Sequence, residues 1–419
     1  MTLLISWIQS ANSADGDFPL NNLPCGVFSN AANTQPRCCT ALGDVVIDLA
    51  AMEGDGFFGE DLGLFCRPGW NAFMAEGPTA WAAWRLRMQS LFSQGSPEAD
   101  RLSRYLVQRH EITLHMPFEV TEFSDFYSSY HHAVNVGSLF RGADNALMPN
   151  WLHVPIGYNG RASSIVLSGT DIRRPMGQIK LQDSDVPVFA PTRRLDMEVE
   201  LGAVIGTPSS GRVDIGQAED MIFGFVLLND WSSRDIQAWE YQPLGPFQSK
   251  ATASSIGAWI VMKEALAPFR RQPPERVKPL LEYLTSHETW VYDIRLRTTL
   301  TPPDGGPSLV SDTNYQTMYY TFAQQLCHHA TSGCPMRTGD LLGSGTISGP
   351  DRDSLGSFLE ITRGGSEPLE LQGGQVRTFI EDGDLLSIHG YAEGEDYRIG
   401  FGICEGRICP AIPETTCRS

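Results

Sequence analysis

The segment from Ile222 to Asp230 places the tightest constraint on the fold. Its first seven residues are apolar apart from Gly224, and the run stops at Asn229-Asp230. An apolar run of this length, bounded by polar residues, is typical of a buried strand. The sequence therefore predicts a buried strand that ends at a carboxylate.

Polar residues recur at helical spacing directly after this strand. Residues at i, i+4, i+7 and i+11 share one face of a helix, and here they are Asp230, Arg234, Gln237 and Tyr241. A helix is predicted over 231–241, ended by Pro243. With Lys250 beyond it, this row suits a site that holds a cation and an oxygen-rich anion. The row equally fits an exposed helix face on which Asp230 and Arg234 form a contact worth roughly 0.3 kcal/mol.

Chain length and charge narrow the class of protein. A chain of 419 residues is long enough for two domains. The formal net charge of -18 argues against binding of nucleic acid or anionic membranes, whose partners carry basic patches. An anionic substrate would need a local positive centre to oppose this field.

The cysteines and the apolar segments indicate a reducing compartment. The nine cysteines are odd in number and scattered without a C-x-x-C pair, so free thiols are expected rather than disulfides or a zinc site. The N-terminal stretch lacks the basic region of a signal peptide, and no apolar run is long enough to span a membrane. We therefore expect a cytoplasmic protein.

We divide the chain into units 1–117 and 118–419 at the connecting segment His115-Met116-Pro117. Most of the predicted elements are strands. We assign the first unit a structural or interface role, because no cluster of His, Cys or carboxylates stands out in it. Strands are predicted at 25–28, 45–49, 164–166, 195–205, 222–228, 259–262, 292–296, 358–361 and 384–388. Helices are predicted at 79–91, 97–110, 131–141, 231–241 and 315–329.

Strict alternation of apolar and acidic residues marks the segment 195–201. Side chains in a strand repeat with period two, so Asp196, Glu198 and Glu200 share one face. Because apolar residues continue the strand to Ile205, this face is expected to be partly buried, where like charges need a cation. Together with Asp230 they make an all-oxygen site of the kind that suits Ca²⁺ or Mg²⁺. The alternative is an acidic edge strand facing water.

A second polar stretch, 124–132, adds candidate ligands and a candidate base. Asp125 offers a further carboxylate and Tyr127 a phenol, and His131-His132 follow on a predicted helix. Neighbouring helix residues point in different directions, so one histidine is better suited to act as a base than both as metal ligands. Arg141 could hold a carboxylate with two hydrogen bonds. A histidine with no catalytic role remains the alternative.

Two glycine-bounded loops and a buried acid complete the candidates. Residues 157–164 present Tyr158 and an arginine, and 343–349 offers backbone amides and the Thr346 hydroxyl, without matching a nucleotide-binding pattern. Glu360 lies within an apolar segment and needs a partner, for which a histidine is the natural choice. No nucleophilic serine motif fits, so a hydrolase of this sequence would use water.

Taken in order, these stretches resemble the fumarylacetoacetate hydrolase family. The motifs that carry the resemblance are DFYSS, PIGYNGRASS, RRPMGQ, LDMEVE, NDWSSRDIQAWEY, PLGPF and GSGTISG. The resemblance implies a mainly β protein with some α, in which an SH3-like N-terminal β-barrel precedes a mixed β-sandwich roll. It also implies a homodimer. The implied reaction is the hydrolysis of a small diketo acid, 4-fumarylacetoacetate, to fumarate and acetoacetate, the last step of tyrosine and phenylalanine catabolism.

The resemblance also implies a role for each matching residue. The metal ligands for Ca²⁺ or Mg²⁺ would be Asp125, Glu198, Glu200 and Asp230, and a second, structural Mg²⁺ would lie near Asp230, Lys250 and Ser254. His132, paired with Glu360, would activate water. Arg234, Gln237 and Lys250 would stabilise the oxyanion. The substrate would be bound by Tyr127, Arg141, Tyr158, Tyr241 and Thr346.

Some positions depart from the family pattern. Asn159 stands where the family usually has His, Ala253 and Ser254 where it has Gly and Thr, and Gln248-Ser249 before Lys250 is also unusual. Ser254 keeps the hydroxyl. These departures leave open a related hydrolase or decarboxylase acting on another acylpyruvate or β-keto acid. A third reading is a non-catalytic protein on this fold, although no predicted catalytic residue is lost.

Overall fold

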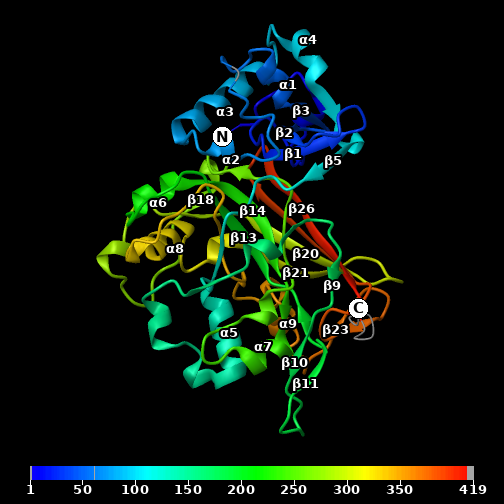
Figure 1. Cartoon of the computed structure of the whole chain (residues 1–419), viewed down its shortest axis with the longest axis vertical. Coiled ribbons are helices and arrows are strands. Elements are labelled where there is room, and N and C mark those ends of the chain that lie inside the picture. The colour runs from blue at the N-terminus through cyan, green and yellow to red at the C-terminus, as the bar shows by residue number, and fades with distance from the viewer. Residues whose placement is uncertain (1, 61, 413–419) are drawn as a thin grey trace, which may run out of the picture.

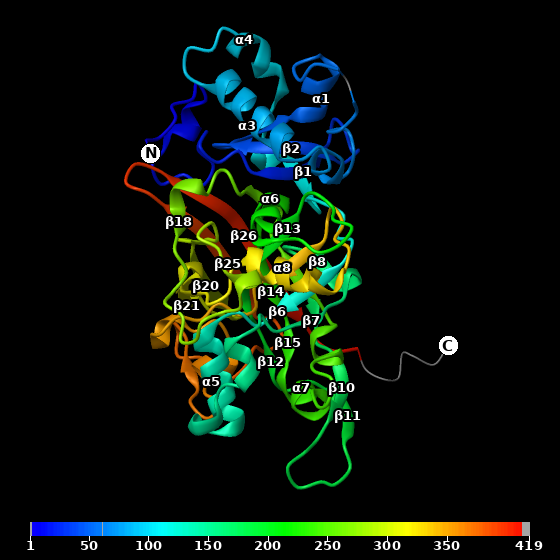
Figure 2. The ribbon, with the colours of Figure 1, turned by 90° about the vertical axis from the view of Figure 1, so that its left-hand side faces the viewer.

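The computed structural model describes residues 2–60 and 62–412, and these are mainly strands with a minority of short helices (Figure 1). The prediction of a mainly β protein is confirmed. The N-terminal residues form a separate lobe at one end of the molecule, and the long strand β26 (Arg398–Cys409) reaches toward it (Figure 2).

The N-terminal lobe is built on a five-stranded antiparallel sheet in the order β4-β3-β2-β1-β5. Its strands are β1 (Cys25–Asn30), β2 (Arg37–Leu42), β3 (Val45–Asp48), β4 (Leu106–Gln108) and β5 (Ile112–His115). Its helices are α1 (Leu49–Gly54), α2 (Asn71–Met74), α3 (Pro78–Phe92) and α4 (Ala99–Leu102). Pro78 opens α3, a position where its missing N–H costs nothing.

The larger part of the chain contains two sheets. The first, of eight strands, has the order β7-β6-β22-β13-β14-β16-β8 with β17 beside β14, and the second has the order β21-β20-β25-β26-β9. The first sheet comprises β6 (Phe123–Phe126), β7 (Gly157–Asn159), β8 (Ile165–Leu167), β13 (Val199–Ile205), β14 (Ile222–Asp230), β16 (Ser254–Ile256), β17 (Val261–Met262) and β22 (Leu341–Gly343). The second comprises β9 (Ile172–Arg173), β20 (Arg295–Thr301), β21 (Ser308–Asn314), β25 (Leu385–Glu393) and β26.

The two sheets pack face to face through β14. Leu227 on β14 lies against Gly390 on β25, where an added Cβ would come within 2.5 Å of it. Every residue of β14 is buried, as its apolar run predicts. Two-stranded ribbons pair β10 (Met176–Ile179) with β11 (Val188–Pro191), β12 (Leu195–Asp196) with β15 (Ser232–Ser233), β18 (Arg270–Arg271) with β19 (Val291–Tyr292), and β23 (Leu369–Glu370) with β24 (Val376–Arg377).

The remaining helices are short and lie around the sheets. They are α5 (Tyr130–Arg141), α6 (Ile215–Met221), α7 (Arg234–Glu240), α8 (Phe322–His329) and α9 (Phe358–Ile361). One continuous core joins the N-terminal lobe to the first sheet, because Trp70 and Trp81 pack on Phe223 of β14 with ring centroids 6.3 and 5.0 Å away.

Several of the predicted elements differ in type or extent; the expected helix over 231–241, for example, begins only at Arg234, after strand β15. The expected helix over 97–110 is only α4, followed by a single 3₁₀ turn and strand β4. The expected helix over 315–329 is shortened to α8 after a 3₁₀ turn. The segment 358–361, predicted as a strand, is the single helical turn α9, because Ser357 caps it and accepts a hydrogen bond from the Glu360 N–H.

Among the described residues, no helix combines the length and apolar character that crossing a membrane requires. Eight of the predicted free thiols lie in this part of the chain and none forms a disulfide. The ninth, Cys417, lies outside the described residues, as does the end of the predicted unit 118–419.

Candidate active site

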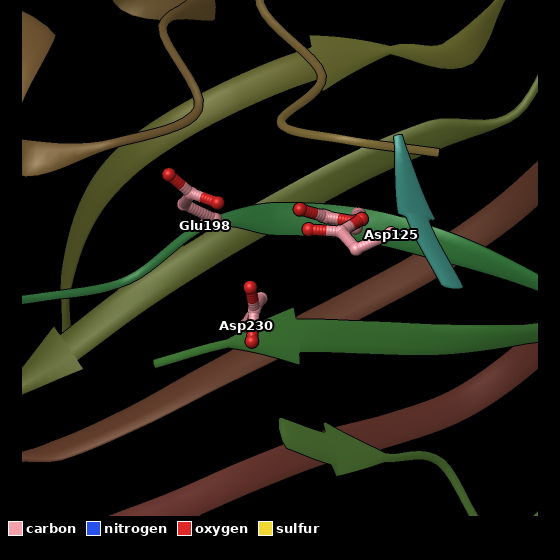
Figure 3. A group of neighbouring side chains, drawn as sticks. Asp125, Glu198 and Asp230 are labelled. Carbon is pink, nitrogen blue, oxygen red and sulfur yellow. The ribbon is translucent and has the colours of Figure 1, made fainter. Parts of the chain in front are cut away.

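Four buried carboxylates meet on inner strands of the first sheet, near the end of β14 (Figure 3). Asp125 lies on β6, Glu200 on β13 and Asp230 at the end of β14, while Glu198 lies between β12 and β13. The sheet order brings these segments together, because β22 alone separates β6 from β13 and β14 pairs directly with β13. Each residue offers one oxygen, and these oxygens all lie within 4.8 Å of one another.

Burial and mutual repulsion disfavour the charges on two of these acids. Burial raises the pKa of Asp125 well above its usual range, and the neighbouring Asp230 raises it further. Burial and the charge of Asp125 likewise raise the pKa of Glu200. Asp125 Oδ1 and Glu200 Oε1 are buried without a hydrogen-bond partner among the residues described. Unpartnered buried acceptors of this kind point to a cation as their counterpart.

Two cations of the chain hold Glu198 in its charged form. Lys250 Nζ contacts Glu198 and lies 3.0 Å from Asp230 Oδ2, while Arg234 Nη1 lies 2.8 Å from Glu198 Oε1. Burial by itself raises the pKa of Glu198, but Lys250 and Arg234 outweigh it and lower that pKa below its usual range. Glu198 therefore remains an anion.

Hydroxyl groups orient Asp230. Ser254 Oγ donates to Asp230 Oδ1 at 2.6 Å and Tyr158 OH donates to Oδ2 at 2.9 Å. Burial and the neighbouring Asp230 raise the pKa of Tyr158, so its phenol keeps the proton that it donates. The predicted candidates Tyr158, Lys250 and Ser254 thus all contact the carboxylate that the apolar run placed at the end of its strand.

The donor set fits a hard divalent cation. All four candidate ligands are carboxylates, which Ca²⁺ and Mg²⁺ prefer. The backbone of Gly343 on β22 leaves room for the cluster, since a Cβ there would lie 2.4 Å from Asp125 Oδ1 and 3.1 Å from Glu200 Oε2. Gly345, at φ +74°, donates its N–H to Glu200 Oε2 at 3.0 Å.

A buried histidine and glutamate form a second arrangement beside the cluster. His132 Nδ1 lies 2.7 Å from Glu360 Oε2, joining α5 to α9. Burial raises the pKa of Glu360, but His132 and hydrogen bonds from Asn135 and Ser357 outweigh it and lower that pKa. The ionised Glu360 therefore accepts the Nδ1 proton, and His132 Nε2 keeps the lone pair that can accept another.

Further polar groups gather near these two arrangements. Arg234 Nη1 donates to Gln237 Oε1 at 3.1 Å, which leaves the Gln237 Nε2 amide as the donor available to a ligand. Thr346 Oγ1 is buried without a partner among the described residues. The Tyr127 ring packs edge-on against His132, with centroids 5.2 Å apart.

Three predicted candidates are not brought into the cluster. The exposed Arg141, at the end of α5, donates to the backbone oxygens of Asn145 and Ala146. Tyr241 lies at the surface beyond α7, with its ring 6.4 Å from that of Phe140. Asp196, expected with the acidic face, contacts Arg234 and α9 instead of the other carboxylates.

Sequence reasoning missed the groups that hold Glu360. Ser348 and Ser357 donate their hydroxyls to Glu360 Oε2 at 2.9 and 2.8 Å, and Asn135 Nδ2 donates to Oε1 at 2.9 Å. A signal for one of them exists, because Ser357 and Glu360 have the S-x-x-E spacing of a helix start. No local pattern points to Asn135 or Ser348.

Comparison with known proteins shows which family the chain belongs to. The model for the fumarylacetoacetate (FAA) hydrolase C-terminal region matches residues 121–409, and that for the fumarylacetoacetase N-terminal region matches residues 21–117. The chain belongs to the fumarylacetoacetate hydrolase family. It is 45% identical to the fumarylacetoacetase of Arabidopsis thaliana over 99% of this chain and 100% of that protein. It is 43% identical to that of Homo sapiens over 95% and 97%.

Solved structures agree on the fold. A fumarylacetoacetate hydrolase from Exiguobacterium antarcticum superimposes with a TM-score of 0.55 over 93% of this chain and 99% of that one, at 14% identity. Two of the departures from the family pattern can be placed. Asn159 is exposed and pairs with Ser124, next to Asp125, and Ser254 makes its hydrogen bond to Asp230 with the hydroxyl that it retains.

Proposed function

We propose that this enzyme hydrolyses the carbon–carbon bond of 4-fumarylacetoacetate to give fumarate and acetoacetate. The observation that carries the proposal is a buried His132-Glu360 pair near a cluster of four carboxylates. Full-length identity of 43–45% to fumarylacetoacetases from a plant and a mammal supports this substrate.

His132 is the proposed general base. Its Nε2 accepts a proton from water, which then attacks the ketone carbon, and Glu360 stabilises the imidazolium that forms. Proton transfer of this kind contributes about 10²–10⁴ in rate. The proton held on His132 can afterwards pass to the carbon of the departing acetoacetate.

Arg234, Gln237 and Lys250 are the proposed donors to the developing oxyanion. Arg234 and Lys250 carry their charge permanently, because their carboxylate neighbours outweigh the effect of burial and raise the pKa of both. Preorganised donors of this type contribute roughly 3–4 kcal/mol each. Tyr127, Tyr158 and Thr346 are proposed to bind the substrate from the buried side, and Arg141 and Tyr241 from the ends of α5 and α7.

Asp125, Glu198, Glu200 and Asp230 are proposed to hold the divalent cation, Ca²⁺ or Mg²⁺. When bound, the ion supplies Lewis-acid stabilisation of the substrate's diketo oxygens and a positive centre for a dianion. A second, structural Mg²⁺ is proposed to lie near Asp230, Lys250 and Ser254, where the Ser254 hydroxyl and the Asp230 carboxylate offer oxygen donors 2.6 Å apart.

We extend the proposal to the architecture and setting of the enzyme. The two domains are 1–117 and 118–419, a boundary supported by the two family models that meet there. The N-terminal sheet forms an SH3-like barrel and the larger part a mixed β-sandwich roll. The enzyme acts as a cytoplasmic homodimer in the breakdown of tyrosine and phenylalanine.

The decisive experiment follows the loss of fumarylacetoacetate absorbance with purified enzyme. Turnover is expected with Ca²⁺ or Mg²⁺ present and is expected to vanish after treatment with chelator. A simple acylpyruvate, assayed in parallel, is expected to react far more slowly. Faster turnover of the acylpyruvate would favour the related hydrolase, and full activity of the metal-free enzyme would refute the role of the ion.

A further inference from the structure

Asp196 is separated from the other acids of its segment although it shares their strand face. Pairing between β12 and β15 joins Asp196 to Ser232, and pairing between β13 and β14 starts again at Val199. Asp196 is fully buried, with 0% of its surface exposed, and is not among the four candidate metal ligands. A carboxylate buried this deeply needs polar or charged partners other than a metal ion.

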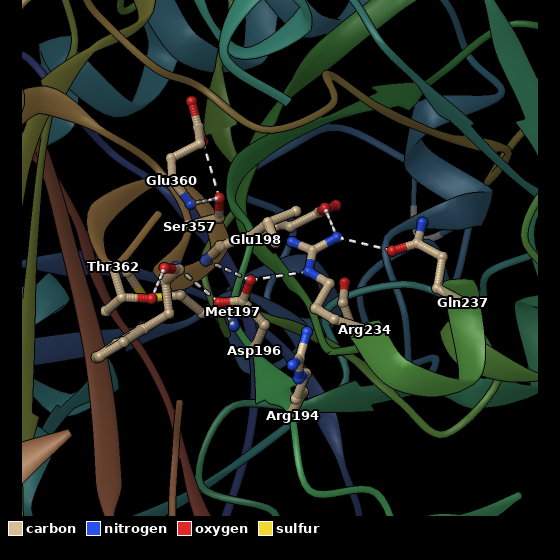
Figure 4. A network of polar contacts seen from close by, with 12 residues as sticks. Arg194, Asp196, Met197, Glu198, Arg234, Gln237, Ser357, Glu360 and Thr362 are labelled. Carbon is tan, nitrogen blue, oxygen red and sulfur yellow. Dashed lines mark hydrogen bonds and ion pairs between the residues drawn. The ribbon is translucent and has the colours of Figure 1, made fainter. Parts of the chain in front are cut away.

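Four N–H groups surround the Asp196 carboxylate. Oδ1 accepts from the backbone N–H of Met197 at 2.8 Å and of Phe358 at 2.7 Å. Oδ2 accepts from the backbone N–H of Leu359 at 2.9 Å and from Arg234 Nε at 2.8 Å. One carboxylate thus joins the guanidinium of Arg234 on α7 to the first turn of α9 (Figure 4).

The contacts of Arg234 leave one part of its guanidinium free. Nε is bound by Asp196, and Nη1 is bound by Glu198 and Gln237. Nη2 is buried and has no hydrogen-bond partner among the residues that the structure describes. Because the guanidinium is planar, fixing Nε and Nη1 also fixes the direction in which Nη2 donates.

The contacts of Asp196 with α9 connect it to the histidine-glutamate pair. Phe358 and Leu359, whose N–H groups Asp196 accepts, come immediately before Glu360 in α9. Ser357, at the start of the same turn, donates to Glu360 Oε2 at 2.8 Å, and Glu360 in turn contacts His132. Asp196 thus ties down the backbone turn that carries Glu360.

We propose that Asp196 is a positioning residue that holds the oxyanion donor Arg234 and the Glu360 turn in one fixed relation. It is not among the four candidate metal ligands. Its role is to set the direction of Arg234 Nη2 relative to the base. The inference deepens the proposed hydrolysis and rests on it.

Asp196→Asn tests this role with little change in shape. An amide has one acceptor oxygen, so two of the four N–H groups would face an NH₂ group that cannot accept them. Arg234 would then depend on Glu198, which Lys250 also contacts. A loss of orientation that matters in the transition state lowers kcat with little effect on KM.

Asp48 offers a matched control in the N-terminal lobe. It is buried, its Oδ2 accepts from Arg37 Nε at 2.8 Å, and its Oδ1 accepts from the Ala51 N–H at the start of α1. Asp48→Asn removes the same kinds of contact far from the carboxylate cluster. Its effect reports the structural cost of the exchange alone.

The experiment is a double-mutant cycle on kcat with the metal-loaded enzyme. Asp196→Asn is expected to lower kcat about 10- to 100-fold with KM changed less than about threefold, and Asp48→Asn is expected to leave both within about twofold. In an Arg234→Met background, Asp196→Asn is expected to cost at least about threefold less than in the parent, because Arg234, one of the two groups that Asp196 holds, is gone. Asp48→Asn is expected to cost the same in both backgrounds.

Equal losses from Asp196→Asn in both backgrounds, or a kcat within about threefold of the parent, would overturn the proposal. If Asp196→Asn does not fold, Arg234→Lys decides, since lysine lacks the planar fork with which Arg234 contacts Asp196 through Nε and both Glu198 and Gln237 through Nη1. A kcat within about threefold of the parent for Arg234→Lys would show that charge without orientation suffices. A parent enzyme that leaves fumarylacetoacetate unchanged would instead refute the proposed function.

Discussion

Replacing Glu200 by Gln is expected to stabilise the metal-free protein while weakening its metal binding. Glu200 is fully buried, and its Oε1 lacks a partner in the described part of the chain. A glutamine keeps an oxygen for the Gly345 N–H and offers an NH₂ group to the unpartnered Asp125 Oδ1. The exchange therefore removes a repulsion and adds a hydrogen bond.

The size of the effect follows from the separation of the carboxylates. Their oxygens lie within 4.8 Å of one another. Two unit charges at about 5 Å repel by roughly 3 kcal/mol at an effective dielectric constant of about 20. Protonation relieves part of this, so a gain of about 1–3 kcal/mol is expected. In a chain of this size that corresponds to a rise in Tm of about 1–3 °C.

The pH dependence of the metal-free protein gives a second measure of the same repulsion. Folding raises the pKa of Asp125 and Glu200, so the folded chain binds more protons than the unfolded chain. The stabilisation from their protonated forms is complete below the unfolded values near about 4 and is lost as the pH rises through the raised values. Glu200→Gln is expected to flatten this loss.

Differential scanning fluorimetry with chelator and with saturating Ca²⁺ or Mg²⁺ measures both effects. The parent is expected to gain about 3 kcal/mol at 100 times the Kd of the ion, and Glu200→Gln much less. Glu53→Gln is the control, because Glu53 is buried and binds the Leu64 and Phe65 N–H groups with separate oxygens at 2.9 Å each. It is expected to lower Tm. A similar fall in metal-free Glu200→Gln would refute the reasoning.

Three further substitutions probe the base, the room for the cluster and the orientation of Asp230. His132→Ala is expected to lower kcat about 10²–10⁴-fold with KM little changed, measured by steady-state kinetics, and a loss under about tenfold would remove it as the base. Gly343→Ala puts a Cβ 2.4 Å from Asp125 Oδ1 and is expected to weaken Ca²⁺ binding, measured by calorimetry, at least about tenfold. Gly211→Ala is the control, because its Cβ meets nothing within 4 Å. Ser254→Ala removes a donor to Asp230 and is expected to cost about 1–3 kcal/mol in urea unfolding, and an unchanged midpoint would contradict that contact's importance.

The sequence predicts the candidate site best where a local residue pattern is enough to set the position of a side chain. The apolar run to Leu228 leads to a fully buried strand with Asp230 at its end, as expected. Alternation places Glu198 and Glu200 together, because period two is a property of any strand. That Asp125 joins them depends on the neighbouring strands β6 and β22, an association between distant segments that no local pattern reveals.

Predictions were weakest for short segments and for side-chain partners. The four residues of α9 fit a strand or a helix equally well by their apolar content, and the cap from Ser357 decides between them. Asp196 shares a strand face with Glu198, yet the turn that it binds lies 162 residues further along the chain. Such partnerships arise from tertiary packing, which periodicity does not encode.

The shared core between the N-terminal lobe and β14 has a consequence for inherited or engineered variation. Phe223, which packs on Trp70 and Trp81, lies on the strand that ends at Asp230. A cavity in that aromatic cluster would cost about 3–5 kcal/mol, enough to unfold much of a marginally stable population. Substitutions far from the candidate active site would thus reduce the abundance of the enzyme in the cell. The molecules that remain folded would turn over substrate at the normal rate.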